Sequence, residues 1–243
     1  MFLKKKLRVI LEDPASRGFL MVNDILAAFT ILSVISIVLE TVPAFVHLKP
    51  LFDTVEYTTV AVFTLEYFAR MYAAPRKRDY IFGFFGIIDL LAIAPTYLTL
   101  ANFTFLKTAR VLRILRFLRA IRLAKIAELR TFSEVENNAS LYWLNIGIYF
   151  LALMCVVLFL GGLMYVVEEG NADFSSIPLG MLWATKVVLG GLGGSTIAQV
   201  PATALGEGVA IFTRFCGLLL LGLLIHVVGN VIRLGLLGKT RKK

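Results

Sequence analysis

The stretch FLKTARVLRILRFLRAIRLAKI, residues 105–126, decides how this chain folds. It has the length of a membrane-spanning helix, about 20 residues, yet a basic residue stands at every third position along its centre. The basic residues are Arg110, Arg113, Arg116, Arg119, Arg122 and Lys125. The residues between them are apolar, so the charges form a stripe that winds slowly on an α-helix and runs straight on a 3₁₀-helix. The stripe covers roughly 22 Å at 1.5 Å per residue, most of the thickness of the hydrocarbon core of a bilayer.

Apolar runs of similar length lie on both sides of this charged segment. They occupy residues 19–42, 55–74, 81–101, 142–167 and 205–237. A shorter apolar run near 176–189 is followed by a glycine cluster, a pattern typical of a re-entrant helix and loop. The chain is 58% hydrophobic and only 17% charged, whereas soluble domains carry about a quarter charged residues. We therefore expect an all-α integral membrane protein with six spans and a re-entrant element before the last.

The distribution of Lys and Arg between the connections predicts the orientation of the spans. If the charged segment is a span, one side of the membrane holds fourteen basic residues and the other holds three. The fourteen lie in 1–18, 75–80, 127–141 and 233–243. Because basic loops stay in the cytoplasm, we expect both termini there, in a multi-pass protein of the cell membrane.

A buried arginine costs about 2.5–3.5 kcal/mol even on lenient insertion scales, so the stripe needs acidic partners. The preceding spans supply Glu40, Glu56, Glu66 and Asp89. Glu66 and Asp89 stand well inside their spans, and we expect both to lie close to a basic side chain of the stripe. Glu40 and Glu56 are equally compatible with carboxylates at helix ends that face lipid headgroups. Acids paired with a movable column of arginines form a voltage sensor; the alternative for the stripe is an amphipathic helix on the inner leaflet.

Several other classes of protein are disfavoured by the composition. The 25 Lys and Arg against 16 Asp and Glu give a net charge of +9, but the apolar content and the lack of a recognition motif argue against nucleic acid. Cys155 and Cys216 form no disulfide framework, and His47 and His226 are too few for a zinc site. GxSxG, P-loop and HExxH motifs are absent from the sequence. We expect no enzyme, no metal and no resident cofactor.

Two further stretches make a family resemblance specific. FTLEYFARMYAAP (63–75) and IIDLLAIAP (87–95), together with the charged segment, resemble the sensor of the six-transmembrane voltage-gated ion channel superfamily, nearest its prokaryotic-type voltage-gated potassium channels. The resemblance implies that Phe63, Glu66 and Asp89 form the charge-transfer site that passes each arginine across a hydrophobic plug. It also implies that Glu56 belongs to an outer acidic cluster. Glu40 remains a further countercharge by its place at the end of the first span.

The second half of the chain resembles the pore of the same family. VPATALGEG (200–208) and GNVI (229–232) match the start and end of the inner helix, which puts Gly217 at the position of the family's hinge glycine. From the residues alone, Gly217 is either a bending point or a close-packing point for a neighbouring helix.

The expected selectivity filter departs from the family. Where potassium channels have T-V-G-Y-G-D, this chain has Gly190, Gly191, Leu192, Gly193, Gly194 and Ser195. The glycines give the freedom that a ring of carbonyls needs, but the threonine, aromatic and aspartate side chains that brace the loop are missing. Lys186 and Arg214 add positive charge nearby. The departure leaves the fold intact and calls potassium selectivity, and conduction itself, into question.

These interpretations combine into a domain plan of a four-helix voltage sensor and a two-helix pore module with a re-entrant pore helix and loop. The plan has a cytoplasmic N-terminus (1–18), a voltage sensor (19–126), a linker (127–141), a pore domain (142–237) and a basic tail (238–243). Two pore helices cannot enclose a pathway, so we expect a homotetramer in contact with membrane lipids, with no nucleic acid and no soluble ligand as partner.

The function that this plan predicts is a voltage-gated cation channel of the potassium type, opened by movement of the charged segment. We then expect no cofactor, and a permeant ion that is potassium in the family. One alternative keeps the sensor but has a pore that is non-selective, non-conducting or anion-passing. The other is a secondary transporter, which the dissimilar halves of the chain disfavour.

Overall fold

In the computed structural model, residues 16–74, 76–100, 115–122, 138–190 and 199–237 are described. At residues 138–145, 230–231 and 233–237 the description is of the backbone alone. Every regular element within these ranges is a helix, which confirms the predicted all-α fold. The chain divides into two compact units, 1–133 with 176–178, and 134–175 with 179–243.

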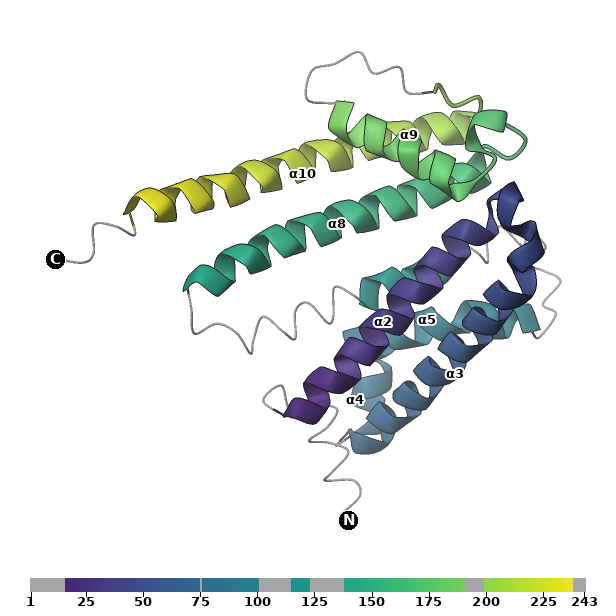
Figure 1. Cartoon of the computed structure of the whole chain (residues 1–243), viewed down its shortest axis with the longest axis vertical. Helices are drawn as coiled ribbons and strands as arrows, with labels where there is room; N and C mark the ends of the chain where they lie inside the picture. The colour runs from purple at the N-terminus through teal and green to yellow at the C-terminus, as the bar shows by residue number, and fades with distance from the viewer. Residues whose placement is uncertain (1–15, 75, 101–114, 123–137, 191–198, 238–243) are drawn as a thin grey trace. The chain divides into compact units, whose positions relative to one another are not determined.

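The first unit begins with α2 (Arg17–Glu40) and continues through the 3₁₀-helix η1 (Pro43–Leu48) into α3 (Lys49–Ala73) (Figure 1). The Ser16 side chain accepts a hydrogen bond from the backbone N–H of Phe19 at 3.0 Å, which caps the start of α2. Proline stands in the first turn of both η1 and α3, where its missing N–H has no helical partner to lose. α2 and α3 then pack against each other.

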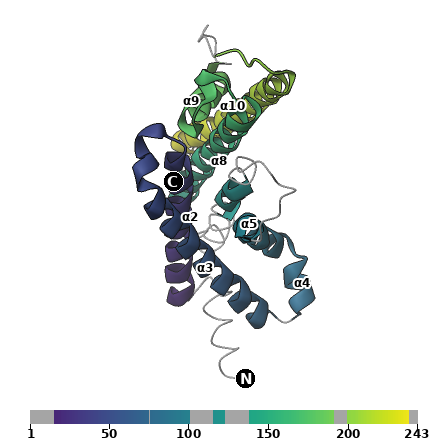
Figure 2. The ribbon, with the colours of Figure 1, turned by 90° about the vertical axis from the view of Figure 1, so that its right-hand side faces the viewer.

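The predicted third span, 81–101, is wrong at its start. The structure has a short helix α4 (Lys77–Ile81) and then a separate α5 (Phe84–Leu100) (Figure 2). The chain folds tightly between them, because a Cβ atom at Gly86 would lie 1.9 Å from the carbonyl oxygen of Tyr80. Only glycine allows this approach of α4 to the first turn of α5.

The described part of the charged segment, residues 115–122, is helical throughout. Its centre is a 3₁₀-helix, η3 (Phe117–Ala120), which packs against α5 and α2. Three residues per turn match the three-residue spacing of the charges, so Arg116, Arg119 and Arg122 follow one line along the helix. The remaining basic residues of the stripe, Arg110, Arg113 and Lys125, lie outside the described residues.

The first unit buries polar side chains beside its apolar core and exposes large apolar side chains on its outside. On α2 the side chains of Asn23, Thr30 and Ser33 are buried, whereas Leu32 and Ile35 are about half exposed. Large apolar side chains on the outside of a helix bundle suit a lipid environment. The polar groups that face inward are then available to bind the charged segment.

The second unit consists of α8 (Asn138–Val167), η4 (Ala172–Phe174), α9 (Ile177–Gly190) and α10 (Ala204–Leu237). α8 and α10 run side by side, with the shorter α9 against one end of the pair (Figure 1). α8 starts within the segment predicted as a linker, 127–141. The buried core joins all three helices and η4: Val157, Leu160, Met164, Phe174, Trp183, Ala184, Val187 and Ala210.

Within the described residues, three helical stretches are long and apolar enough to cross a membrane: Arg17–Glu40, Ile146–Val167 and Ala204–Gly229. α5 is shorter, with 17 residues, and α3 carries charged residues on its buried face. Two of these residues, Glu56 and Glu66, bind the charged segment. The six-span arrangement therefore stays a prediction for α3, α5 and the charged segment.

Candidate functional site

The Arg119 side chain lies at the centre of a polar cage in the first unit and is 0% exposed. Its Nε donates to the carbonyl oxygen of Ala92 at 2.7 Å. Nη1 donates to Ser33 Oγ and to Glu56 Oε2, both at 2.6 Å. Nη2 donates to Glu56 Oε1 at 2.6 Å and to Thr96 Oγ1 at 2.9 Å. We call Ser33, Glu56, Ala92 and Thr96 the Arg119 cage; it draws on α2, α3 and α5.

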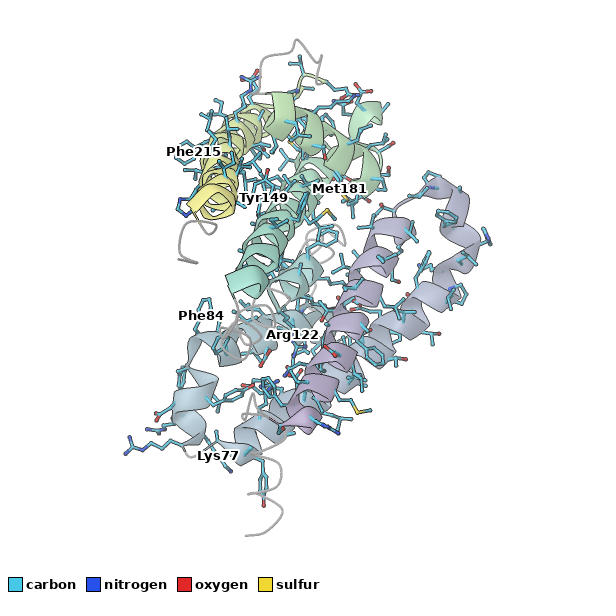
Figure 3. The ribbon with its side chains drawn as sticks, turned by 60° about the vertical axis from the view of Figure 1, so that its left-hand side comes forward. Lys77, Phe84, Arg122, Tyr149, Met181 and Phe215 are labelled. Carbon is cyan, nitrogen blue, oxygen red and sulfur yellow. The ribbon has the colours of Figure 1, made fainter. Side chains whose placement is uncertain are left out.

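The Arg122 side chain occupies a second site, formed by Phe63, Glu66 and Asp89. Its Nη2 donates to Glu66 Oε2, and its Nε lies 3.2 Å from Asp89 Oδ1. The guanidinium carbon is 3.9 Å from the centroid of the Phe63 ring, within the range of a cation–π contact. Figure 3 shows Arg122 among the helices of this unit, whereas Lys77 projects away from them. The predicted proximity of Glu66 and Asp89 to the stripe is confirmed.

An apolar layer separates the carboxylates of the two sites along α3. Phe63 is 1% exposed and clusters with Leu26, Val60, Ala92 and Ile93. Glu56 precedes Phe63 by two helical turns and Glu66 follows it by one, so the backbone positions of the two acids lie roughly 15 Å apart along the axis. Arg119 and Arg122 bind on successive turns of the charged segment, one to each carboxylate.

Arg116 lies one step before Arg119 in the stripe and is bound more loosely. Its Nε is 3.6 Å from Glu56 Oε1, and its Nη1 is 3.9 Å from Glu40 Oε2. Glu40 and Glu56 therefore both approach the stripe, and Glu56 is buried rather than a headgroup-facing carboxylate. The alternative that the stripe lies on the membrane surface does not account for these buried pairs.

Three polar residues that the sequence reasoning missed or left without a role complete the Arg122 site. Arg70 Nε binds Glu66 Oε1 at 2.7 Å, and Arg70 Nη2 donates to Asn23 Oδ1 at 3.4 Å. Tyr80, on α4, donates its hydroxyl proton to Asp89 Oδ2 at 2.8 Å. Burial and the neighbouring Asp89 carboxylate raise the pKa of Tyr80, so it stays a donor. The spacing of Glu66 and Arg70 by four residues was a signal for their pairing.

In the second unit, Glu168 joins the end of α8 to the start of α10. Its carboxylate accepts hydrogen bonds from the backbone N–H groups of Ala202 and Thr203 at 2.8 and 2.9 Å, and from Thr203 Oγ1 at 2.6 Å. Asn171 Nδ2 donates a fourth at 3.2 Å. Burial raises the pKa of Glu168, but these hydrogen bonds outweigh it and leave the pKa below its ordinary value. No sequence motif pointed to this residue.

The pore helix α9 is anchored by Trp183, whose ring nitrogen donates to the backbone carbonyl of Gln199 at 2.9 Å. Trp183 is 1% exposed and packs edge-on against Phe174. Gly190, the first residue of the predicted filter, is the last residue of α9. The rest of the filter, 191–195, lies outside the described residues.

Gly217 is a close-packing point against α9. A Cβ atom there would lie 3.0 Å from the backbone oxygen of Val188 and 3.1 Å from its Cα. α10 continues without a break through this position. The packing alternative for Gly217 is therefore observed, and a role as a hinge stays a prediction.

The charged side chains near the expected pore differ in their exposure. Lys186 on α9 is half-buried, whereas Glu207 and Arg214 on α10 are exposed. In the part of the chain that the structure describes, no three His, Cys, Asp or Glu side chains are arranged to hold a metal ion.

Residues 22–234 match the family of proteins described as ion transport protein. A putative potassium channel protein of Rhodopseudomonas palustris is 31% identical over 242 residues, 91% of this chain and 56% of that protein. The human voltage-gated potassium channel regulatory subunit KCNF1 is 27% identical over 196 residues, 76% of this chain and 39% of its own length. The human A-type voltage-gated potassium channel KCND3 is 27% identical over 237 residues, 89% of this chain and 35% of its own length. The chain thus spans between 35% and 56% of the lengths of these relatives.

Proposed function

Since this chain belongs to the ion transport protein family, within the potassium branch of the voltage-gated channels, we propose that it is a voltage-gated cation channel of the potassium type. Its similarity to potassium channel proteins from bacteria and mammals supports this function. These matches favour a channel over an enzyme. They also disfavour the secondary transporter.

The observation that carries the proposal is the binding of two successive arginines on either side of Phe63. Arg119 is held by Glu56, and Arg122 by Glu66 and Asp89. A shift of the charged segment by one step of three residues replaces each arginine by the next at the same acids. Each step carries charge across the apolar layer, and a charge moved through the whole field is worth about 2.3 kcal/mol per 100 mV. The energy of the membrane potential is thereby coupled to the position of the helix.

The assembly that we propose is a homotetramer in the cell membrane, with both termini in the cytoplasm and potassium as the permeant ion. The following apolar side chains of α10 are exposed in a single chain and are available for contact with neighbouring subunits: Leu205, Ile211, Phe215, Leu218, Leu219 and Ile225. The fourteen-to-three distribution of basic residues supports the orientation.

A second candidate function keeps the sensor and changes the pore. The glycine-rich stretch after α9 lacks the side chains that brace a potassium filter. One relative is named a regulatory subunit, which favours a subunit that modifies other channels rather than conducting alone. In this alternative the voltage sensor works while the homomeric pore passes no selective current.

Recordings from the purified full chain in planar bilayers test both candidates. The proposed channel gives a current that rises steeply with voltage, and the regulatory alternative gives displacement of sensor charge without ionic current. Absence of both, with correctly inserted protein, contradicts voltage sensing altogether.

A further inference from the structure

The Arg119 cage is complementary to a guanidinium group in number and direction of hydrogen bonds. A guanidinium has five N–H donors in a rigid plane. The five bonds from Nε, Nη1 and Nη2 to the cage use all of them. The carboxylate of Glu56 accepts two bonds in parallel, the geometry that arginine alone among cationic side chains can offer.

Three of the four groups of the cage are held by contacts other than those with Arg119: Thr96 and Glu56 by a mutual hydrogen bond, and Ala92 by its helix. The Thr96 hydroxyl donates its own proton to Glu56 Oε1, which leaves its lone pairs directed at Arg119. The Ala92 carbonyl belongs to the backbone of α5 and is positioned by that helix. Ser33 and Thr96 are buried at 0% and 2% exposure with Arg119 in place, so bulk water does not compete with the arginine for these acceptors.

The Arg122 site is a natural contrast, because it recognises charge more than shape. There Nε and Nη2 approach carboxylates and the guanidinium carbon faces the Phe63 ring. Among the described residues, Arg122 Nη1 has no hydrogen-bond acceptor. An ammonium group can satisfy two carboxylates and an aromatic face equally well.

We propose that Ser33, Glu56, Ala92 and Thr96 form a guanidinium-specific binding site, which distinguishes arginine, or a free guanidinium ion, from an ammonium of the same charge. A lysine at position 119 has only three donors, directed tetrahedrally, and leaves acceptors of the cage unpaired. Unpaired buried acceptors are costly, so the substitution weakens this site although the charge is unchanged.

The site has a consequence for the charged segment that rests on the proposed voltage-sensing function. Whichever residue occupies the cage sets a preferred position of the helix, so this position depends on arginine chemistry and not on charge alone. Five of the six basic residues of the stripe are arginine, and the single lysine stands last.

A binding experiment on the purified full chain tests the site without any need for gating. Arg119→Ala empties the cage, and Arg122→Ala is the matched control in the other site. Thermal unfolding is followed with guanidinium chloride and with methylammonium chloride, at low millimolar concentration and equal ionic strength. Guanidinium is expected to raise the melting temperature of Arg119→Ala saturably by about 3–5 °C, while methylammonium does not. For Arg122→Ala the two cations are expected to have equal effects.

Two outcomes overturn the proposal: no stabilisation of Arg119→Ala by guanidinium, or equal stabilisation of it by both cations. If Arg119→Ala does not fold, the comparison of Arg119→Lys with Arg122→Lys decides. The inference requires a clearly larger loss of melting temperature for Arg119→Lys, and equal losses contradict it.

Measurement of sensor charge movement on the same variants separates this inference from the proposed function. Arg119→Lys is expected to shift the midpoint voltage of charge movement more than Arg122→Lys, at unchanged total charge. Absence of any charge movement contradicts voltage sensing; the guanidinium site is then tested by the melting temperatures alone.

Discussion

At the scale of single residues, the sensor half depends on pairs of buried charges rather than on surface salt bridges. Arg119 and Arg122 are 0% and 3% exposed, and Glu56 and Glu66 are both 7% exposed. Removing one member of a buried pair leaves the other charge unpaired, at a cost of about 3–5 kcal/mol. On the proposed function, each arginine that leaves a carboxylate is followed by another at the same spacing, so the carboxylate stays paired.

Replacement of Arg116 or Arg119 by Gln is expected to make activation shallower in voltage. In a tetramer each substitution removes four charges, worth up to about 9 kcal/mol of coupling per 100 mV if the charge crosses the whole field. The slope of the charge–voltage relation measures the effect, and Lys77→Gln is the control because Lys77 is exposed and outside the stripe. Unchanged steepness for both arginine variants means that the stripe is structural.

At the scale of helices, the second unit is held by two kinds of contact that fix where elements meet. Glu168 binds the backbone at the start of α10, where a carboxylate also interacts favourably with the helix dipole. α8 and α9 meet at glycine on both sides, since a Cβ at Gly180 would lie 2.1 Å from the Gly161 oxygen. Together these contacts hold α8, α9 and α10, and the expected filter lies between α9 and α10 in the sequence.

Glu168→Gln is expected to destabilise the second unit by about 1–3 kcal/mol, since the amide keeps fewer and weaker acceptors for the N–H groups of α10. The pKa of Glu168 is lowered in the folded protein, so its contribution is present above the ordinary pKa of about 4.3 and is lost as the pH falls below it. Unfolding of the wild type and the variant from pH 7 to 3 measures how the contribution of Glu168 to stability depends on pH. A difference in stability that does not shrink in acid contradicts the assignment. Glu169→Gln, at an exposed neighbouring position, is the control.

Gly161→Ala is expected to disrupt the crossing of α8 and α9, because its methyl group would lie 2.5 Å from the backbone nitrogen of Met181. The expected loss of stability is at least about 1–3 kcal/mol, as for other overpacked interiors. Gly147→Ala, on the same helix with no atom within 4 Å of the added Cβ, is the matched control. Thermal unfolding of the two variants gives the comparison, and similar melting temperatures contradict the close crossing.

At the scale of the whole molecule, the two units differ in whether a single chain provides partners for their charged and apolar groups. The first unit pairs its buried arginines internally. In the second unit, α10 exposes a long apolar surface, and two long helices with one short helix cannot enclose an ion pathway. On the proposed function, selectivity then belongs to the assembled tetramer and to the stretch of sequence that follows α9.

The homomeric protein is expected to discriminate weakly between potassium and sodium, or to pass no cation current, while its sensor still moves. The loop from Gly190 to Ser195 lacks the Thr, aromatic and Asp side chains that brace a carbonyl filter, and Lys186 and Arg214 raise the local positive potential. The measurement is the reversal potential under opposed potassium and sodium gradients. A value near the potassium equilibrium potential contradicts this expectation.

Local patterns in the sequence determined the helices and the kind of chemistry that they carry. The three-residue spacing of Arg116, Arg119 and Arg122 predicted a charged helix, and the depth of Glu66 and Asp89 predicted that they would bind it. Periodicity is a short-range property, so one sequence is enough to reveal it.

Only the tertiary structure decided which groups meet. Arg119 binds Glu56 across 63 residues and Ser33 across 86, and no spacing within one helix reports such a pairing. The carbonyl of Ala92 in the Arg119 cage belongs to the backbone, which carries no signature of its own in the sequence. Glu168 was overlooked because its partners are backbone N–H groups 34 and 35 residues away. Gly217 was compatible with bending or packing until Val188 was found against it, because a glycine's role depends on what approaches it in space.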